Sequence, residues 1–339
     1  MDESGPVVLP ATPEFLPQLQ VDGRSLSRVD LAEWLTSGNN PPSSRVFVNR
    51  IWRMLFGTGI SKVLDDIGAQ GEWPTHPELL DWLSAEFVES GWDVKHLFRT
   101  IVTSETYRRS SSASKELAAL DPYNRLLARQ SNFRLPAEVV RDNALVISGL
   151  LEREIGGRST RPYQPVGYYA QLNFPKRAYQ HDRDRNQFRR GVYTHWQRTF
   201  LHPMLGAFDA PNREECTAER PRSNTPLAAL VLLNDPTFVE ASRVLAERLM
   251  DSGGTTVEER IASAYRRALS RVPTPDELSL LSGLFQEQLA RYQDDSSAAA
   301  ALCRTGVSPV PDNVDLAELA AWTAITRVIL NLHETITRY

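Results

Sequence analysis

Apolar residues recur every three to four positions over most of the chain, which is the period of an amphipathic α-helix. Before residue 158, Gly and Pro breakers divide this pattern into separate segments. The segments predict helices over about residues 31–35, 44–56, 76–90, 93–102 and 136–155. The second segment is apolar over most of its circumference, which predicts a buried helix that ends at Gly57.

Helix-start signals return after residue 224. Each is a capping side chain followed by Pro, by Glu three residues later or by a periodic apolar run, and they stand at Thr225, Asp235, Thr256, Thr274 and Asp315. No segment repeats at a fixed period, which argues against a solenoid. The C-terminal part of the chain is therefore predicted to be helical as well.

Residues 158–224, which we call the central insert, lack the helical period and are rich in aromatic residues, proline and arginine. The run from Gly191 to Trp196 predicts a short strand, because β-branched and aromatic residues favour extended backbone. A loop this long is uncommon in a compact domain unless it is functional or disordered, and its aromatics favour order. We predict a mainly α, multi-helix globular fold with an irregular central insert that carries one or two short strands.

The same pattern divides the chain into four parts. Residues 1–24 are expected to form a tail or linker, 25–157 an N-terminal helical part, 158–224 the central insert and 225–339 a C-terminal helical part. We expect residues 25 to 339 to form one continuous domain.

Composition narrows the protein class. The 339 residues are 41% apolar and 24% charged, which argues against a disordered or fibrous protein. Since no apolar run approaches about 20 residues, no membrane span is expected, and the N-terminus does not have the pattern of a signal peptide. Two cysteines exclude a disulfide framework and a four-cysteine zinc site, and without a CxxCH motif no haem or other cofactor is expected in this chain.

Charge is distributed unevenly. The whole chain has a formal charge of −4, but residues 158–222 carry 12 basic and six acidic side chains. A cationic insert in an acidic protein indicates an anionic ligand, a glycan or an acidic partner surface. Acidic residues within the insert and the negative total argue against nucleic acid as the partner. Pairing with acidic residues of the chain itself is the simplest alternative.

Nine local strings resemble a bacterial protein family, domain of unknown function 1553, which is abundant in planctomycete-type bacteria. They lie at 45–52 (RVFVNRIW), 68–83, 90–97 (SGWDVKHL), 104–108 (SETYR), 189–194 (RRGVYT), 208–211 (FDAP), 224–236, 271–275 (RVPTP) and 328–331 (VILN). The resemblance extends over nearly the whole chain from about Ser25.

The resemblance implies that the protein works beside other domains. Members of the family are usually the C-terminal part of larger exported polypeptides with a companion domain of unknown function and often a cytochrome c-like domain. This sequence departs from that arrangement, since it has no haem motif, no export signal and no room for the companion domain. It is therefore expected to be a fragment, a mis-started reading frame or a stand-alone version, and an exported, periplasmic location follows from the resemblance alone.

Reactive side chains gather in the central insert. The candidates for a catalytic site are His195, Asp209, Cys216 and Arg220, in which guanidinium groups near Cys216 favour its thiolate. The competing interpretation of Cys216 is a buried small apolar residue. His195 and His202 are weak candidates for metal ligands, but neither HxxxH nor HExxH spacing occurs, so no metal site is expected.

Four further residues are candidates for ligand binding. Arg189 and Arg190 belong to the arginine-rich group around Tyr193, and Asn49 and Arg50 lie in the first string that resembles the family. The alternative, a purely structural role, is that these polar groups bind acidic side chains or loop carbonyls of the chain itself.

Two main functions remain open at this stage. The first is an accessory or interaction module beside redox or carbohydrate-binding domains, and the second is an envelope enzyme, a hydrolase or redox enzyme, with its site in the central insert. An enzyme requires the candidate groups to converge in one pocket, whereas a module predicts that they disperse into ion pairs and caps.

Overall fold

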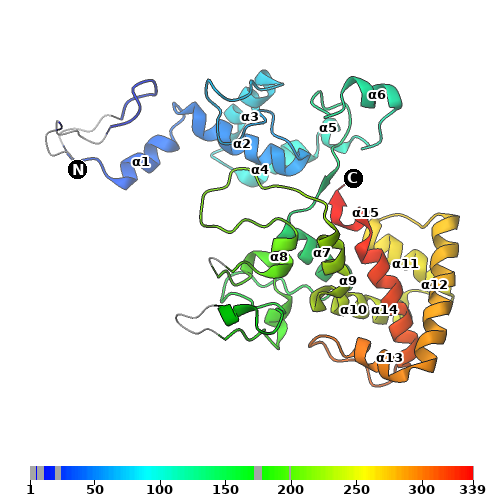
Figure 1. Cartoon of the computed structure of the whole chain (residues 1–339). Coiled ribbons are helices and arrows are strands. Elements are labelled where there is room, and N and C mark those ends of the chain that lie inside the picture. The colour runs from blue at the N-terminus through cyan, green and yellow to red at the C-terminus, as the bar shows by residue number, and fades with distance from the viewer. Residues whose placement is uncertain (1–4, 6–10, 20–23, 172–177, 198–199, 339) are drawn as a thin grey trace. The chain divides into compact units, whose positions relative to one another are not determined.

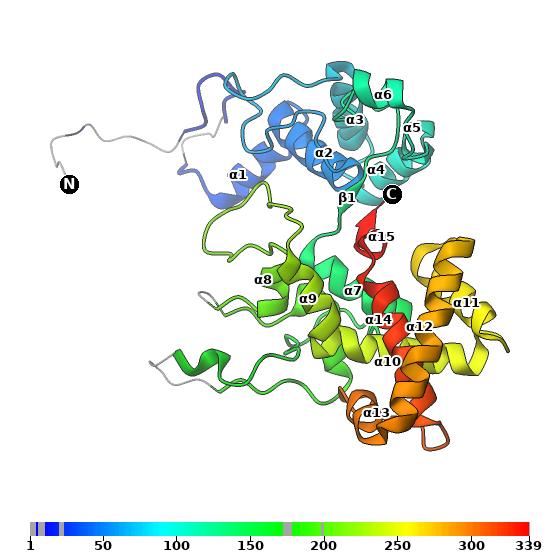
Figure 2. The same cartoon turned by 45° about the vertical axis from the view of Figure 1, so that its right-hand side comes forward.

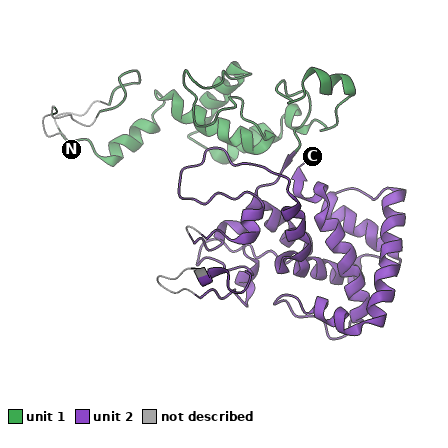
Figure 3. Ribbon diagram, in the orientation of Figure 1, with its two compact units in different colours: residues 1–132, 339 green, residues 133–338 purple. Residues whose placement is uncertain are grey.

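The computed structural model describes residues 5, 11–19, 24–171, 178–197 and 200–338 (Figure 1). These residues contain fifteen α-helices and one two-stranded sheet, which confirms the mainly α fold. The chain forms two compact units, residues 1–132 (unit 1) and residues 133–338 (unit 2) (Figure 3). Within the described part, none of the helices is both long and apolar enough to cross a membrane.

Unit 1 is built around the helix that the sequence predicted to be buried. Its helices are α1 (Arg28–Leu35), α2 (Pro41–Phe56), α3 (Pro77–Glu89), α4 (Val94–Val102), α5 (Glu105–Arg108) and α6 (Lys115–Leu120). Helix α2 ends as expected at Gly57, which has a left-handed φ of 79°. Its buried Val48 and Trp52 pack into one core with Leu83 of α3 and Leu97 of α4.

Unit 2 is organised around its penultimate helix. Figures 1 and 2 show α14 (Leu316–Asn331) between α10 (Pro236–Ser252) and α12 (Pro275–Asp294), and Trp322 of α14 is fully buried in this core. The remaining helices are α7 (Ala137–Ser148), α8 (Pro203–Ala207), α9 (Pro226–Asn234), α11 (Val257–Leu269), α13 (Ser296–Cys303) and α15 (His333–Ile336). The strands β1 (Phe133–Arg134) and β2 (Thr337–Arg338) pair antiparallel and join the two ends of the unit.

Local capping signals in unit 2 have the predicted roles. Thr256 and Thr274 each form a complete capping box with the Glu three residues later. Helix α7 is shorter than predicted, because Gly149 adopts a left-handed φ of 85° and ends the helix before Leu150. The apolar residues after Gly149 continued the helical pattern in the sequence but not the helix itself.

The central insert contains short 3-10 turns in place of the strand expected at 191–196. These turns are η1 (Tyr168–Gln171), η2 (Arg185–Phe188) and η3 (Gly191–Tyr193), and extended pairing is reduced to isolated bridges such as Thr160 with Thr194. Gly191 explains the difference, because its N–H donates to Asp142 Oδ1 at 2.6 Å. A Cβ at Gly191 would lie 2.9 Å from the Cα of Glu138, so the turn sits directly on α7.

Candidate ligand site in the central insert

Helix α7 fixes the backbone of the central insert. The guanidinium of Arg141 is fully buried and donates to the carbonyl oxygens of Gln187 and Arg189, both at 2.5 Å. Two residues after Arg189, the backbone N–H of Gly191 donates to the Asp142 carboxylate. Two adjacent side chains of one helix therefore hold residues 187–191 at three points.

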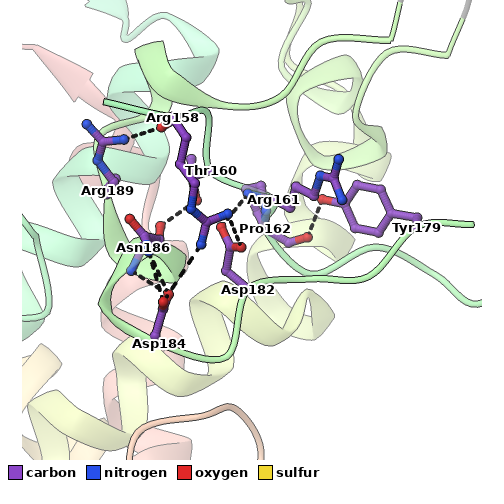
Figure 4. A network of polar contacts seen from close by, with 9 residues as sticks. All are labelled: Arg158, Thr160, Arg161, Pro162, Tyr179, Asp182, Asp184, Asn186 and Arg189. Atoms are coloured by element: carbon purple, nitrogen blue, oxygen red, sulfur yellow. Dashed lines mark hydrogen bonds and ion pairs between the residues drawn. The ribbon is translucent and has the colours of Figure 1, made fainter. Parts of the chain in front are cut away.

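A polar network next to this anchor aligns two distant segments (Figure 4). The Thr160 N–H donates to the Tyr193 carbonyl at 2.8 Å, and the His195 N–H donates to the Thr160 carbonyl at 2.7 Å. Asp182 accepts from the Arg158 guanidinium and from the Arg161 N–H, each at 2.9 Å. These bonds bring Arg161 and His195 next to each other, although they are far apart in the sequence.

The aligned segments enclose a cavity of about 250 Å³. Its lining consists of Arg161, Tyr169, Ala178, Tyr179, His195 and Gln197. The rings of Tyr169 and Tyr179 meet edge to face, with centroids 5.3 Å apart. The Tyr179 hydroxyl donates to the Pro162 carbonyl at 2.6 Å, and burial raises the pKa of this phenol, so the ring stays neutral.

The lining has the chemistry of an anion site with aromatic walls. The Arg161 residue is exposed, and its side chain extends beside the Tyr179 ring (Figure 4). Among the described residues, its guanidinium forms no ion pair. The Arg161 guanidinium supplies hydrogen-bond donors for a carboxylate or sulfate, while tyrosine rings pack against the apolar face of a sugar. The volume is suited to a single sugar residue or a small anion rather than a large cofactor.

A comparison of the sequence with protein-family models identifies the family of this chain. A family model described as PSD1, protein of unknown function (DUF1553), matches residues 27–285. The chain belongs to this family. No curated protein and no solved structure matches it significantly.

The matched region of this DUF1553 protein includes the whole central insert and every residue that lines the cavity. The sequence picked out His195, which lines the cavity, but did not single out Arg161, Gln197 or the two tyrosines as a group. Aromatic enrichment was the available signal, since Tyr169 and Tyr179 belong to it. Nothing local indicated that Thr160 pairs with residues 193–195.

Asp209 and Arg220 form ion pairs with Arg134 and Glu138, and neither lines the cavity that contains His195. Asp209 accepts from the Arg134 guanidinium at 2.5 Å and from the N–H and hydroxyl of Ser223, both at 2.7 Å. One terminal nitrogen of the Arg220 guanidinium donates to both carboxylate oxygens of Glu138, at 2.9 and 3.1 Å. These contacts fasten the loop between Asp209 and Ser223 at both ends.

Cys216 lies in that loop as an exposed free thiol, not as the buried apolar residue that was the alternative. Arg220, whose charge was expected to favour the Cys216 thiolate, forms an ion pair with Glu138. Arg213 of the same loop stacks on Trp196, with 3.7 Å from its guanidinium carbon to the ring centroid. The loop is thus attached to unit 2 by its arginines, while Cys216 faces solvent.

The four ligand candidates divide into buried and more exposed groups. Arg189 is buried and donates to the carbonyls of Gly156 and Arg158. The guanidinium carbons of Arg189 and Arg190 lie 4.1 and 5.7 Å from the centroid of the Tyr193 ring. Asn49 is also fully buried in unit 1. Its side chain exchanges two hydrogen bonds with the backbone of Ser61, at 2.8 and 3.1 Å. Arg50 is exposed on α2.

His202 is buried immediately before α8. Among the described residues, neither of its ring nitrogens has a hydrogen-bond partner of normal geometry. Burial, and next the charge of Arg141, lower the pKa of His202 to about 4. Within the same described part of the chain, no cluster of three His, Cys, Asp or Glu side chains could hold a metal ion.

Acidification is expected to destabilise unit 2 through His202. Because its folded pKa of about 4 lies below the unfolded value of 6.5, the unfolded chain takes up the proton first. The contribution of neutral His202 is complete above pH 6.5 and is lost as the pH falls toward 4, by about 3 kcal/mol. Urea denaturation at a series of pH values measures this loss.

The control for this measurement is a second histidine. His202→Gln is expected to remove most of the pH dependence between pH 6.5 and 4, whereas His76→Gln in unit 1 should leave it unchanged. An equally steep loss of stability in the His202→Gln variant would show that other groups cause it.

Proposed function

We propose that this protein is an accessory binding module whose central insert holds an anionic sugar residue. One observation carries the proposal: the 250 Å³ cavity places the guanidinium of Arg161 beside two tyrosine rings, with His195 and Gln197 also in its lining. The acidic group would pair with Arg161 and the sugar ring would lie against the tyrosines.

Two further observations support binding rather than catalysis. Asp209 and Arg220, the carboxylate and guanidinium suggested for an enzyme site, are held in ion pairs with Arg134 and Glu138. The positive charge of the central insert also favours an acidic ligand over a neutral one. The module would serve companion redox or carbohydrate-binding domains of an exported protein by holding an acidic glycan near them.

Replacing Arg161 tests the site directly. Arg161→Gln is expected to weaken binding of a glucuronic acid disaccharide about tenfold or more, because a charge-assisted hydrogen bond is lost. Isothermal titration calorimetry measures the affinity, with cellobiose as the neutral counterpart. The matched control is Arg183→Gln, since Arg183 is an exposed arginine of the same insert that does not line the cavity.

The proposal requires three results together. The acidic disaccharide must bind more tightly than cellobiose, Arg161→Gln must remove that preference, and Arg183→Gln must retain it. Equal affinities for both disaccharides, or equal losses in the two arginine variants, would contradict an anionic sugar site. Affinity that depends only on salt and on both arginines would indicate diffuse electrostatic binding instead.

A further inference from the structure

Unit 2 contains a second and larger cavity, of about 500 Å³. It lies between the segment that precedes η1, the start of α8, and the junction of α9 with α10. Most of its surface is apolar, from Pro165, Val166, Pro203, Met204, Leu230 and Val231. This volume falls in the range of pockets that take small organic molecules.

One carboxylate interrupts the apolar lining. Asp235 lines the cavity and caps α10, accepting from the Thr237 N–H at 2.9 Å through Oδ1. Burial raises the pKa of Asp235, while the Thr237 hydrogen bonds and the charge of Arg141 act in the opposite direction. A cation in the cavity would offset part of the cost of burying the ionised carboxylate.

Arg141 supplies the positive charge that acts on Asp235. The buried guanidinium of Arg141 interacts with both Asp142 and Asp235. Tyr163, which also lines the cavity, donates to Glu240 at 2.7 Å, and the nearby Arg243 is shared by Glu240 and Glu247. Arg190 is a second cation that acts on Asp142. His202, which is neutral at pH 7 because its pKa is about 4, adds no positive charge.

We propose that this cavity binds a small apolar molecule that carries an ammonium group. The apolar body lies between Val166, Met204 and Leu230, and the ammonium pairs with the carboxylate of Asp235. This site takes a cation and is separate in its lining from the anionic-sugar cavity, so it does not depend on the function proposed above.

A series of ligands with one body and three head groups tests the choice of charge. The probes are 4-phenylbutylammonium, 4-phenylbutan-1-ol and 4-phenylbutyrate, titrated into the full chain by isothermal calorimetry or ligand-observed NMR. The ammonium is expected to bind at least about tenfold more tightly than the alcohol, and the carboxylate most weakly. Equal binding of all three, or no binding of the ammonium up to about 10 mM, would overturn the proposal.

Two sets of variants locate the site. Asp235→Asn retains a side chain that caps helices well, and it is expected to abolish the preference for the ammonium over the alcohol. Leu230→Arg places a long cation in the cavity and is expected to weaken ammonium binding about tenfold. The matched control is Leu227→Arg, because Leu227 is on the same helix, is 58% exposed against 56% for Leu230, and does not line the cavity.

The leucine pair keeps the test decisive if Asp235→Asn does not fold. Loss of binding in Leu230→Arg with retention in Leu227→Arg supports the site. Equal binding by both leucine variants, or an unchanged ammonium preference in a folded Asp235→Asn protein, would overturn it.

Discussion

Glu240→Gln is expected to lower the free energy of unfolding by about 3 kcal/mol. Glu240 is fully buried on α10, and its Oε2 accepts from the Tyr163 hydroxyl at 2.7 Å. Its Oε1 accepts from the N–H groups of Val307 at 2.8 Å and Ser308 at 2.6 Å. A glutamine that still accepts both N–H groups through its oxygen turns its amide nitrogen toward Tyr163, so the hydroxyl loses its acceptor, and the charge that faces Arg243 is removed.

Urea denaturation followed by circular dichroism measures the change, provided that the slope of the transition is unaffected. Asp251→Asn is the control, because Asp251 is an exposed acid on the same helix and its replacement should cost less than about 0.5 kcal/mol. A loss below about 1 kcal/mol in Glu240→Gln would mean that the 306–308 segment is held by other contacts.

Arg141→Met is expected to cost about 3 kcal/mol and to weaken binding of the acidic disaccharide as well. The fully buried guanidinium donates to two carbonyls, and methionine leaves both without that donor. Residues 187–191 would lose two of their three hydrogen bonds to α7, which loosens the alignment that brings His195 beside Arg161. A second effect on affinity would therefore accompany the loss of stability.

Denaturation and calorimetry on the same variant separate these two effects. Arg153→Met is the control, because Arg153 is an exposed arginine close to the end of α7 and should leave both stability and affinity unchanged. Loss of stability with full affinity, measured where the Arg141→Met protein remains folded, would show that the cavity does not depend on this anchor.

Local signals were sufficient to predict most helices of this fold. Each of these signals acts within one turn of helix, so it can be recognised from a short stretch of sequence. Examples are the capping boxes at Thr256 and Thr274 and the left-handed Gly57 after α2. The end of α7 was mispredicted because apolar residues continue past Gly149. The expected strand at 191–196 does not form because of a non-local contact: Asp142 of α7 accepts a hydrogen bond from the N–H of Gly191.

The candidate site depends on contacts that sequence patterns do not encode. Arg161 and Arg189 belong to the same arginine-rich insert, but Arg189 is buried against backbone carbonyls whereas Arg161 lines a cavity. The pairing of Thr160 with His195 decides this difference, and no periodicity or motif predicts it. The sequence therefore singled out the segment and one residue of the candidate cavity, His195, but not the set that surrounds it.

Hydrogen–deuterium exchange with and without the glucuronic acid disaccharide tests the central claim most directly. Ligand in the 250 Å³ cavity is expected to slow exchange of the Thr160 and His195 amides, which join the two segments carrying the cavity lining. Amides in unit 1 and in α11 to α13 should exchange at unchanged rates. Protection that appears elsewhere and leaves these two amides unchanged, or no protection at a saturating concentration, would contradict the account.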